Sequence, residues 1–167
     1  MNVKFVFFLK IIALAECIFG FLLLINELVS LLHLSSLQDI NNQFGGTVDF
    51  FKYKESCYQY IFLYSLLLIT GISFWINRKL YWGLTQVLLI TIFSIINLWF
   101  MSIIRLGVDV CLVILTLIVF IYIEIKMCNS SFLQTMKITK VVKWSFFISG
   151  GLSFIIWLLL GGGGMRE

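Results

Sequence analysis

The sequence predicts an all-α fold: a polytopic integral membrane helical bundle of about five transmembrane helices, or four if the last apolar run does not cross. Of the 167 residues, 61% are hydrophobic and 12% are charged, against about 45–50% and about 25% in soluble domains. The apolar residues are gathered into long runs, and about 20 consecutive apolar residues are needed to cross a hydrocarbon core ~30 Å thick. Both observations favour a membrane protein.

The first apolar run, residues 5–34, is the longest, and it carries two carboxylates, Glu16 and Glu27. As a helix it would extend about 45 Å at ~1.5 Å per residue, so it would cross the bilayer and continue beyond it. The run is too long for the apolar region of a signal peptide, and no small-x-small cleavage site closes it. We therefore interpret it as a retained first span.

The later runs are shorter and follow one another closely. Residues 35–57 are predicted to form an outer loop with a turn at Gly45-Gly46. The runs 58–76, 80–104 and 108–125 are joined by short links, so we expect successive spans to be antiparallel neighbours. A basic inner segment, 126–143, precedes the last run, 144–160, which is near the lower limit of length for a span. For this run, lying on the membrane surface or re-entering the membrane is the alternative.

Residues 1–160 are thus expected to form a single transmembrane domain, followed by a flexible Gly-rich tail at 161–167. The Lys and Arg residues predict its orientation, because cytoplasmic loops carry an excess of them. With a cytoplasmic N-terminus, eight of the twelve lie on the inner side: Lys4, Lys10, Arg78, Lys79, Lys126, Lys137, Lys140 and Lys143. A bacterial inner (plasma) membrane is the expected location.

Glu16 and Glu27 are the first candidates for functional residues. They are eleven residues apart, which brings them within ~20° of each other on a helix. A carboxylate at membrane depth costs on the order of 2.5–3.5 kcal/mol, so this face is expected to point into protein or water. One interpretation is a proton or cation site. The other is a pair of buried polar groups that fix how the first helix packs.

The amides Gln86 and Asn97 are also eleven residues apart, on the third run. Amides inside a bilayer usually bond to another helix, and the Glu16 face of the first helix is the partner we expect for one of them. Glu124, near the inner end of the fourth run, is expected to pair with Lys126 or to extend its carboxylate to the membrane surface.

A candidate helix-packing ridge lies on the last run, where serines recur every four residues at Ser145, Ser149 and Ser153. Small residues at this spacing let two helices approach closely. Cys57 and Cys111 both fall near the outer ends of their spans, and their spacing leaves open whether they form a disulfide.

The sequence carries no recognisable catalytic motif, metal-ligand spacing, cofactor motif or basic nucleic-acid-binding stripe. We therefore predict a small multi-pass membrane protein that serves as an accessory or structural subunit of a larger membrane assembly. A small transporter or channel that couples to protons or cations through Glu16 (and Glu27) is the alternative. An intramembrane enzyme is the least favoured class. The expected partners are the lipid bilayer and other membrane subunits, or a second copy of the chain.

Overall fold

The computed structural model describes residues 3–43, 50–103, 108–129, 133 and 138–161. Within this part of the chain every regular element is an α-helix, which confirms the predicted class. The helices are α1 (Val3–Gln43), α2 (Phe50–Ile76), α3 (Arg78–Ile103), α4 (Val108–Met127) and α6 (Lys140–Leu160). The expected turn at Gly45-Gly46, the Cys111 side chain and the tail after Gly161 lie outside the described residues.

Four of these helices are long and apolar enough to cross a membrane. The segments are Phe7–Leu34, Lys54–Ile76, Arg78–Leu98 and Val142–Leu160. Val142–Leu160 contains the run 144–160, for which the sequence left open whether it crosses the membrane. Its length and composition are those of a membrane span. The twenty residues of α4 extend about 30 Å, the thickness of a hydrocarbon core.

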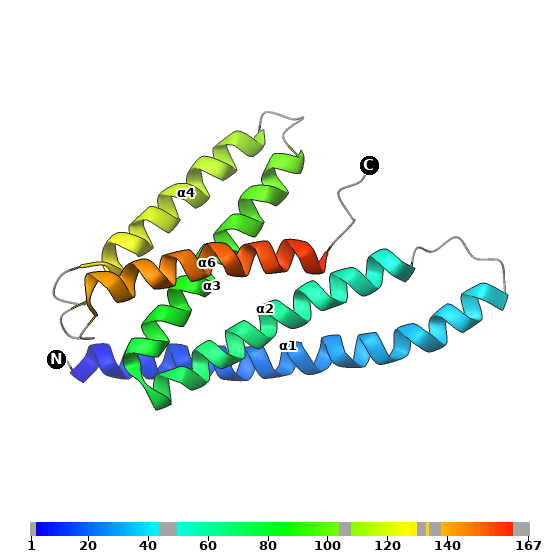
Figure 1. Cartoon of the computed structure of the whole chain (residues 1–167), viewed down its shortest axis with the longest axis horizontal. Coiled ribbons are helices and arrows are strands. Elements are labelled where there is room, and N and C mark those ends of the chain that lie inside the picture. Colours follow the sequence, from blue (N-terminus) through cyan, green and yellow to red (C-terminus); the bar gives the residue numbers. More distant parts are fainter. Residues whose placement is uncertain (1–2, 44–49, 104–107, 130–132, 134–137, 162–167) are drawn as a thin grey trace.

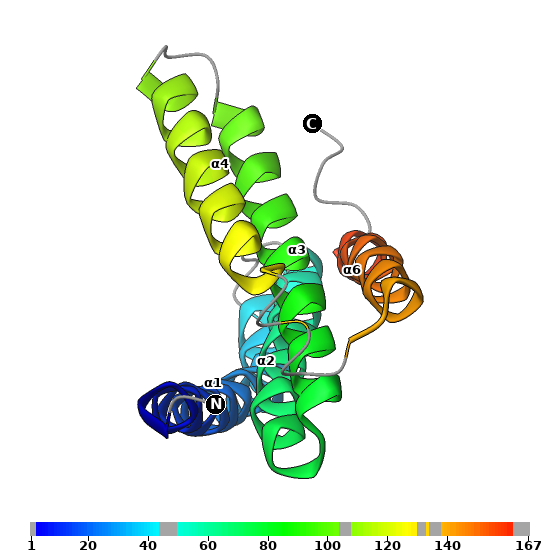
Figure 2. The ribbon, with the colours of Figure 1, turned by 90° about the vertical axis from the view of Figure 1, so that its left-hand side faces the viewer.

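α3 is the central helix of the arrangement. α1 and α2 lie side by side and antiparallel, and α4 runs antiparallel to α3 (Figure 1). Figure 2 shows α6 on the other side of α3 from α4. α3 packs against α2, α4 and α6, whereas α4 packs against α3 alone among the described helices.

The helices extend further than the expected outer loop allows. α1 continues to Gln43 and α2 begins at Phe50, so most of the segment 35–57 is helical. No proline interrupts this segment, and helix growth is cooperative once a helix has formed. Polar side chains on such extensions can be solvated outside the bilayer. The predicted outer loop is therefore too long, because α1 and α2 both extend into it beyond the ends of the apolar runs.

The link between α2 and α3 is a single residue, Asn77. Its side-chain Oδ1 accepts a hydrogen bond from the backbone N–H of Lys79 at 2.9 Å, which is the bond that an N-cap residue makes at a helix start. Next to this turn, the rings of Phe74 and Tyr81 meet edge to face at 5.0 Å. These two rings and Ala13 of α1 form a small buried apolar cluster. The cap and the cluster fix the sharp reversal between α2 and α3.

α1 and α2 approach each other closely at two glycines. A Cβ atom at Gly20 would lie 2.7 Å from the backbone nitrogen of Leu68. A Cβ at Gly71 would lie 2.7 Å from the carbonyl oxygen of Ala13 and 2.8 Å from the backbone nitrogen of Cys17. These are backbone atoms, which cannot turn aside as the end of a side chain can. Small residues at such positions let transmembrane helices pack at short range.

We therefore predict that Gly71→Ala destabilises the protein, because α1 and α2 must move apart to admit the methyl group. Overpacking of this kind costs about 1–3 kcal/mol. Unfolding in mixed detergent micelles, followed by circular dichroism, measures the effect.

Gly151→Ala is the matched control, since nothing lies within 4 Å of a Cβ built at Gly151. We expect this variant to be neutral or up to about 1 kcal/mol more stable, because alanine favours the helix. Equal stability of the Gly71→Ala variant and the wild-type protein would contradict the close contact.

Candidate functional site

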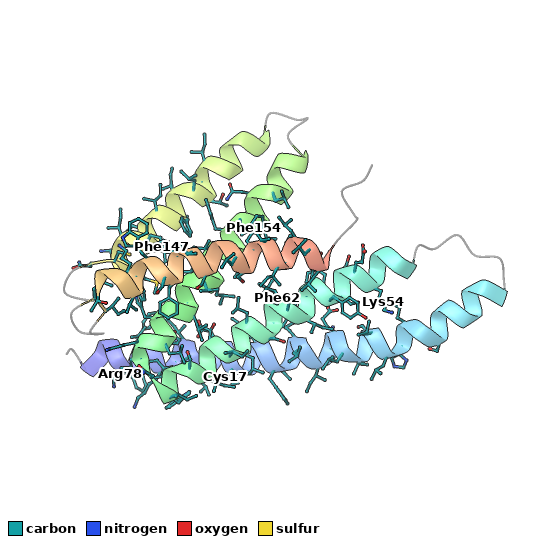
Figure 3. All side chains as sticks on the ribbon, viewed as in Figure 1. Cys17, Lys54, Phe62, Arg78, Phe147 and Phe154 are labelled. Carbon is teal, nitrogen blue, oxygen red and sulfur yellow. The ribbon has the colours of Figure 1, made fainter. Side chains whose placement is uncertain are left out.

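Glu16 lies where α1 meets α2 and the start of α3. The hydroxyl of Tyr81, at the beginning of α3, donates a hydrogen bond to its carboxylate. Tyr81 itself is only 4% exposed. The Oε2 atom of Glu16 is buried and has no hydrogen-bond partner among the described residues. One carboxylate oxygen thus holds α1 to α3, and the other is available to a proton, a cation or a further donor. Figure 3 shows the neighbouring Cys17 at this contact between α1 and α2.

Glu27 takes part in a separate contact, between α1 and α2. Its carboxylate hydrogen-bonds to the buried thiol of Cys57 and lies near Tyr64. Cys57 is a free cysteine. Glu16 and Glu27 are separated by eleven residues of α1, or about 16 Å along the helix axis. The two carboxylates therefore have different neighbours and do not form one site.

Gln86 and Glu124 join α3 to α4. The Gln86 side chain is fully buried. With its amide nitrogen turned towards the carboxylate, it donates to the two oxygens of Glu124 at 2.7 and 2.9 Å. The Cys128 thiol lies 3.6 Å from the same carboxylate. Trp82 of α3 also bonds to α4: its indole N–H donates a hydrogen bond to the Met127 carbonyl oxygen at 3.2 Å.

This contact lies close to the basic end of α6. Lys143 of α6 acts electrostatically on both Glu124 and Cys128. Burial is the main cause that raises the pKa of the Cys128 thiol, and the Lys143 ammonium partly offsets it. At neutral pH the thiol is therefore protonated and can donate to Glu124.

Two expected pairings are replaced by others. Glu124 pairs with Gln86, while the ammonium of Lys126 lies 5.5 Å from the centre of the Tyr122 ring. Neither amide meets Glu16. Asn97 donates to the Phe93 carbonyl oxygen of its own helix at 2.7 Å. It also lies sixteen residues beyond Tyr81 along α3, about 24 Å at 1.5 Å per residue.

The predicted serine ridge divides in two. Ser153 is buried and accepts a hydrogen bond from Thr91 of α3 at 3.0 Å. Ser145 and Ser149 are exposed, and each donates to a carbonyl of its own helix. The α6 face that meets α3 also includes Gly150, where a Cβ would lie 2.8 Å from the Ile90 side chain.

The far end of α6 is held by α2. The Gln59 side-chain nitrogen donates to the Trp157 carbonyl oxygen at 3.1 Å. The same carbonyl oxygen also accepts the backbone N–H of Gly161 at 3.3 Å, so Gln59 adds a second hydrogen bond that links the end of α6 to α2. The Trp157 indole nitrogen is buried without a partner in the described part of the chain.

Three polar residues of α3 are spaced five apart and each bonds to a different helix. Tyr81, Gln86 and Thr91 recur every five residues, and five residues rotate a helix by about 500°, which is 140° beyond a full turn. Successive members therefore point in three directions. Tyr81 bonds to Glu16 of α1, Gln86 to Glu124 of α4, and Thr91 to Ser153 of α6. A spacing of eleven, as between Gln86 and Asn97, finds only residues on the same side of the helix. It therefore does not detect residues that point to different neighbours.

No family model matches the sequence, and no match to it is found among curated proteins or solved structures.

We predict that Gln86 and Glu124 are energetically coupled. Gln86→Leu should destabilise the protein because the half-buried Glu124 carboxylate loses its amide donor and keeps only the Cys128 thiol. A double-mutant cycle with Glu124→Leu is expected to give a coupling of roughly 0.6–2 kcal/mol, the range for polar contacts between membrane helices. Unfolding in mixed micelles measures the four stabilities.

The control cycle combines Glu124→Leu with Lys126→Ala, for which we expect no coupling beyond experimental error. Coupling of Glu124 to Lys126 instead of Gln86 would contradict the observed pairing.

Proposed function

We propose that this chain is an accessory or structural subunit of a larger membrane assembly, with no catalytic chemistry of its own. The supporting observation is how its buried polar groups are used. In the described helices four polar contacts join two helices of the same chain: Glu16–Tyr81, Glu27–Cys57, Gln86–Glu124 and Thr91–Ser153. The buried hydroxyls of Thr70 and Ser73 instead bond to carbonyls of their own helix. Intramembrane catalysis needs several such groups to converge on one reacting centre. Pairing between helices instead builds a rigid scaffold.

The exposed surface of α4 supports a role in assembly. α4 packs against α3 alone among the described helices, so most of its circumference faces lipid or another protein. Its exposed large apolar side chains are Ile114, Leu115, Leu117, Ile118, Val119, Ile121, Tyr122 and Ile125. A helix attached along one side only has room for a neighbouring membrane helix, and we propose that a partner subunit packs there.

For the orientation we propose a cytoplasmic N-terminus, in a bacterial inner membrane. The start of α1, the turn at Asn77, the end of α4 and the start of α6 lie at one end of the structure (Figure 1, left). This end carries the exposed residues Lys10, Arg78, Lys79 and Lys126. A concentration of Lys and Arg of this kind is typical of a cytoplasmic side.

One observation favours the alternative, a transporter or channel coupled to protons or cations. The buried Oε2 atom of Glu16 lacks a hydrogen-bond partner among the described residues, at membrane depth. Intramembrane carboxylates of this kind occur in proton relays and ion pathways. In this alternative Tyr81 would hold the carboxylate in place while its free oxygen gains and loses the proton.

The test is purification of the tagged protein in mild detergent, with quantitative mass spectrometry of the proteins that accompany it. We expect another membrane protein in a fixed molar ratio. Ile118→Trp, on the exposed face of α4, should reduce its recovery several-fold. Ile155→Trp on α6 is the control, because Ile118 and Ile155 are 56% and 51% exposed.

Recovery of this chain alone would contradict the subunit role. The same preparation, reconstituted into liposomes, then tests the alternative by a proton-flux assay. Flux that Glu16→Gln abolishes and Glu27→Gln retains would establish a transporter.

A further inference from the structure

The amide of Asn26 occupies the side of α1 that faces away from α2. Glu16, Gly20 and Glu27 all lie on the side that contacts α2 or the start of α3, whereas Asn26 is exposed. Within the described residues, its main-chain carbonyl accepts a hydrogen bond from Ser30, but no hydrogen bond involves its side-chain amide. α1 forms the edge of the structure in Figure 2, with no described helix on its outer side.

The contacts of α1 with α2 place Asn26 well inside the apolar segments long enough to cross a membrane. Gly20 is opposite Leu68, and because the helices are antiparallel, each step forward in α1 is a step back in α2. Asn26 is therefore level with about Phe62, which Figure 3 shows within α2. The span of α2 begins at Lys54, eight residues before Phe62. Asn26 thus lies about 12 Å inside that end of the span, at 1.5 Å per residue.

The residues around Asn26 form a stripe with the spacing of a coiled coil. Successive members are three and four residues apart along α1: Phe19, Leu22, Asn26, Val29 and His33. All five are exposed; Phe19 is 60% exposed, Leu22 57% and Val29 46%. A stripe of alternating three- and four-residue steps is the packing face of parallel two-stranded helices, and one asparagine within it selects register and partner number.

We propose that this stripe binds the same stripe of a second copy of the chain, which makes the protein a parallel homodimer through α1. Two copies inserted with the same orientation place identical residues at the same depth. The two Asn26 amides then meet, and each donates an N–H to the carbonyl oxygen of the other. A different partner would need its own polar group at this depth, whereas a second copy supplies one by symmetry. This proposal is independent of the subunit role.

The experiment measures energy transfer between donor- and acceptor-labelled copies of the full chain in phosphatidylcholine liposomes, over a range of protein-to-lipid ratios. The wild-type protein should show a dimer whose fraction rises with protein density. Asn26→Leu should weaken the dimer about 3- to 30-fold, the effect of losing one polar contact between membrane helices. Asn26→Gln retains an amide and should recover most of the affinity.

Two further variants separate the stripe from the rest of α1. Leu22→Trp adds bulk within the stripe and should weaken the dimer. Leu28→Trp adds the same bulk two residues from Asn26, on another side of the helix where Leu28 is 43% exposed, and should leave the dimer unchanged. Circular dichroism checks that each variant remains folded. A wild-type protein that stays monomeric at all densities would overturn the proposal, as would a dimer insensitive to both Asn26→Leu and Leu22→Trp.

Discussion

The exclusion of water from a bilayer core is the constraint on which this structure depends. A polar group that water would satisfy in a soluble protein must find its partner within the protein. α3 meets this requirement with residues five apart, each of which bonds to a different helix. Tyr81 reaches α1, Gln86 reaches α4 and Thr91 reaches α6. One central helix is thereby linked to three others through three individual polar contacts.

Close packing adds to these polar contacts where side chains are small. Gly20 and Gly71 bring the backbones of α1 and α2 together, and Gly150 brings α6 against Ile90 of α3. Between membrane helices, lipid tails are as apolar as leucine, so burial of apolar surface gives little advantage and short-range packing becomes more important. This is consistent with the many exposed large apolar side chains on α1, α2, α4 and α6.

The sequence predicts the class and the order of the helices, because apolar run length is set directly by bilayer thickness. It also places Glu16 and Glu27 on one side of their helix. It does not predict their partners. Residue spacing shows which residues share a side of one helix, but the identity of the neighbour depends on how separate helices cross. Spacing alone therefore predicts that either Gln86 or Asn97 meets the Glu16 face, whereas Gln86 bonds to Glu124 and Asn97 to its own helix. The polar composition of 35–57 likewise concealed its helical parts.

The most direct test of this account is whether α2 crosses a bilayer between Lys54 and Lys79, since the energetic importance of the buried polar contacts depends on a membrane interior. Each lysine is replaced by cysteine in a chain whose four native cysteines are replaced by serine, and sealed vesicles are treated with a membrane-impermeant maleimide. The account predicts that one of the two cysteines reacts in intact vesicles and the other only after the vesicles are opened. Reaction of both from the same side would contradict it.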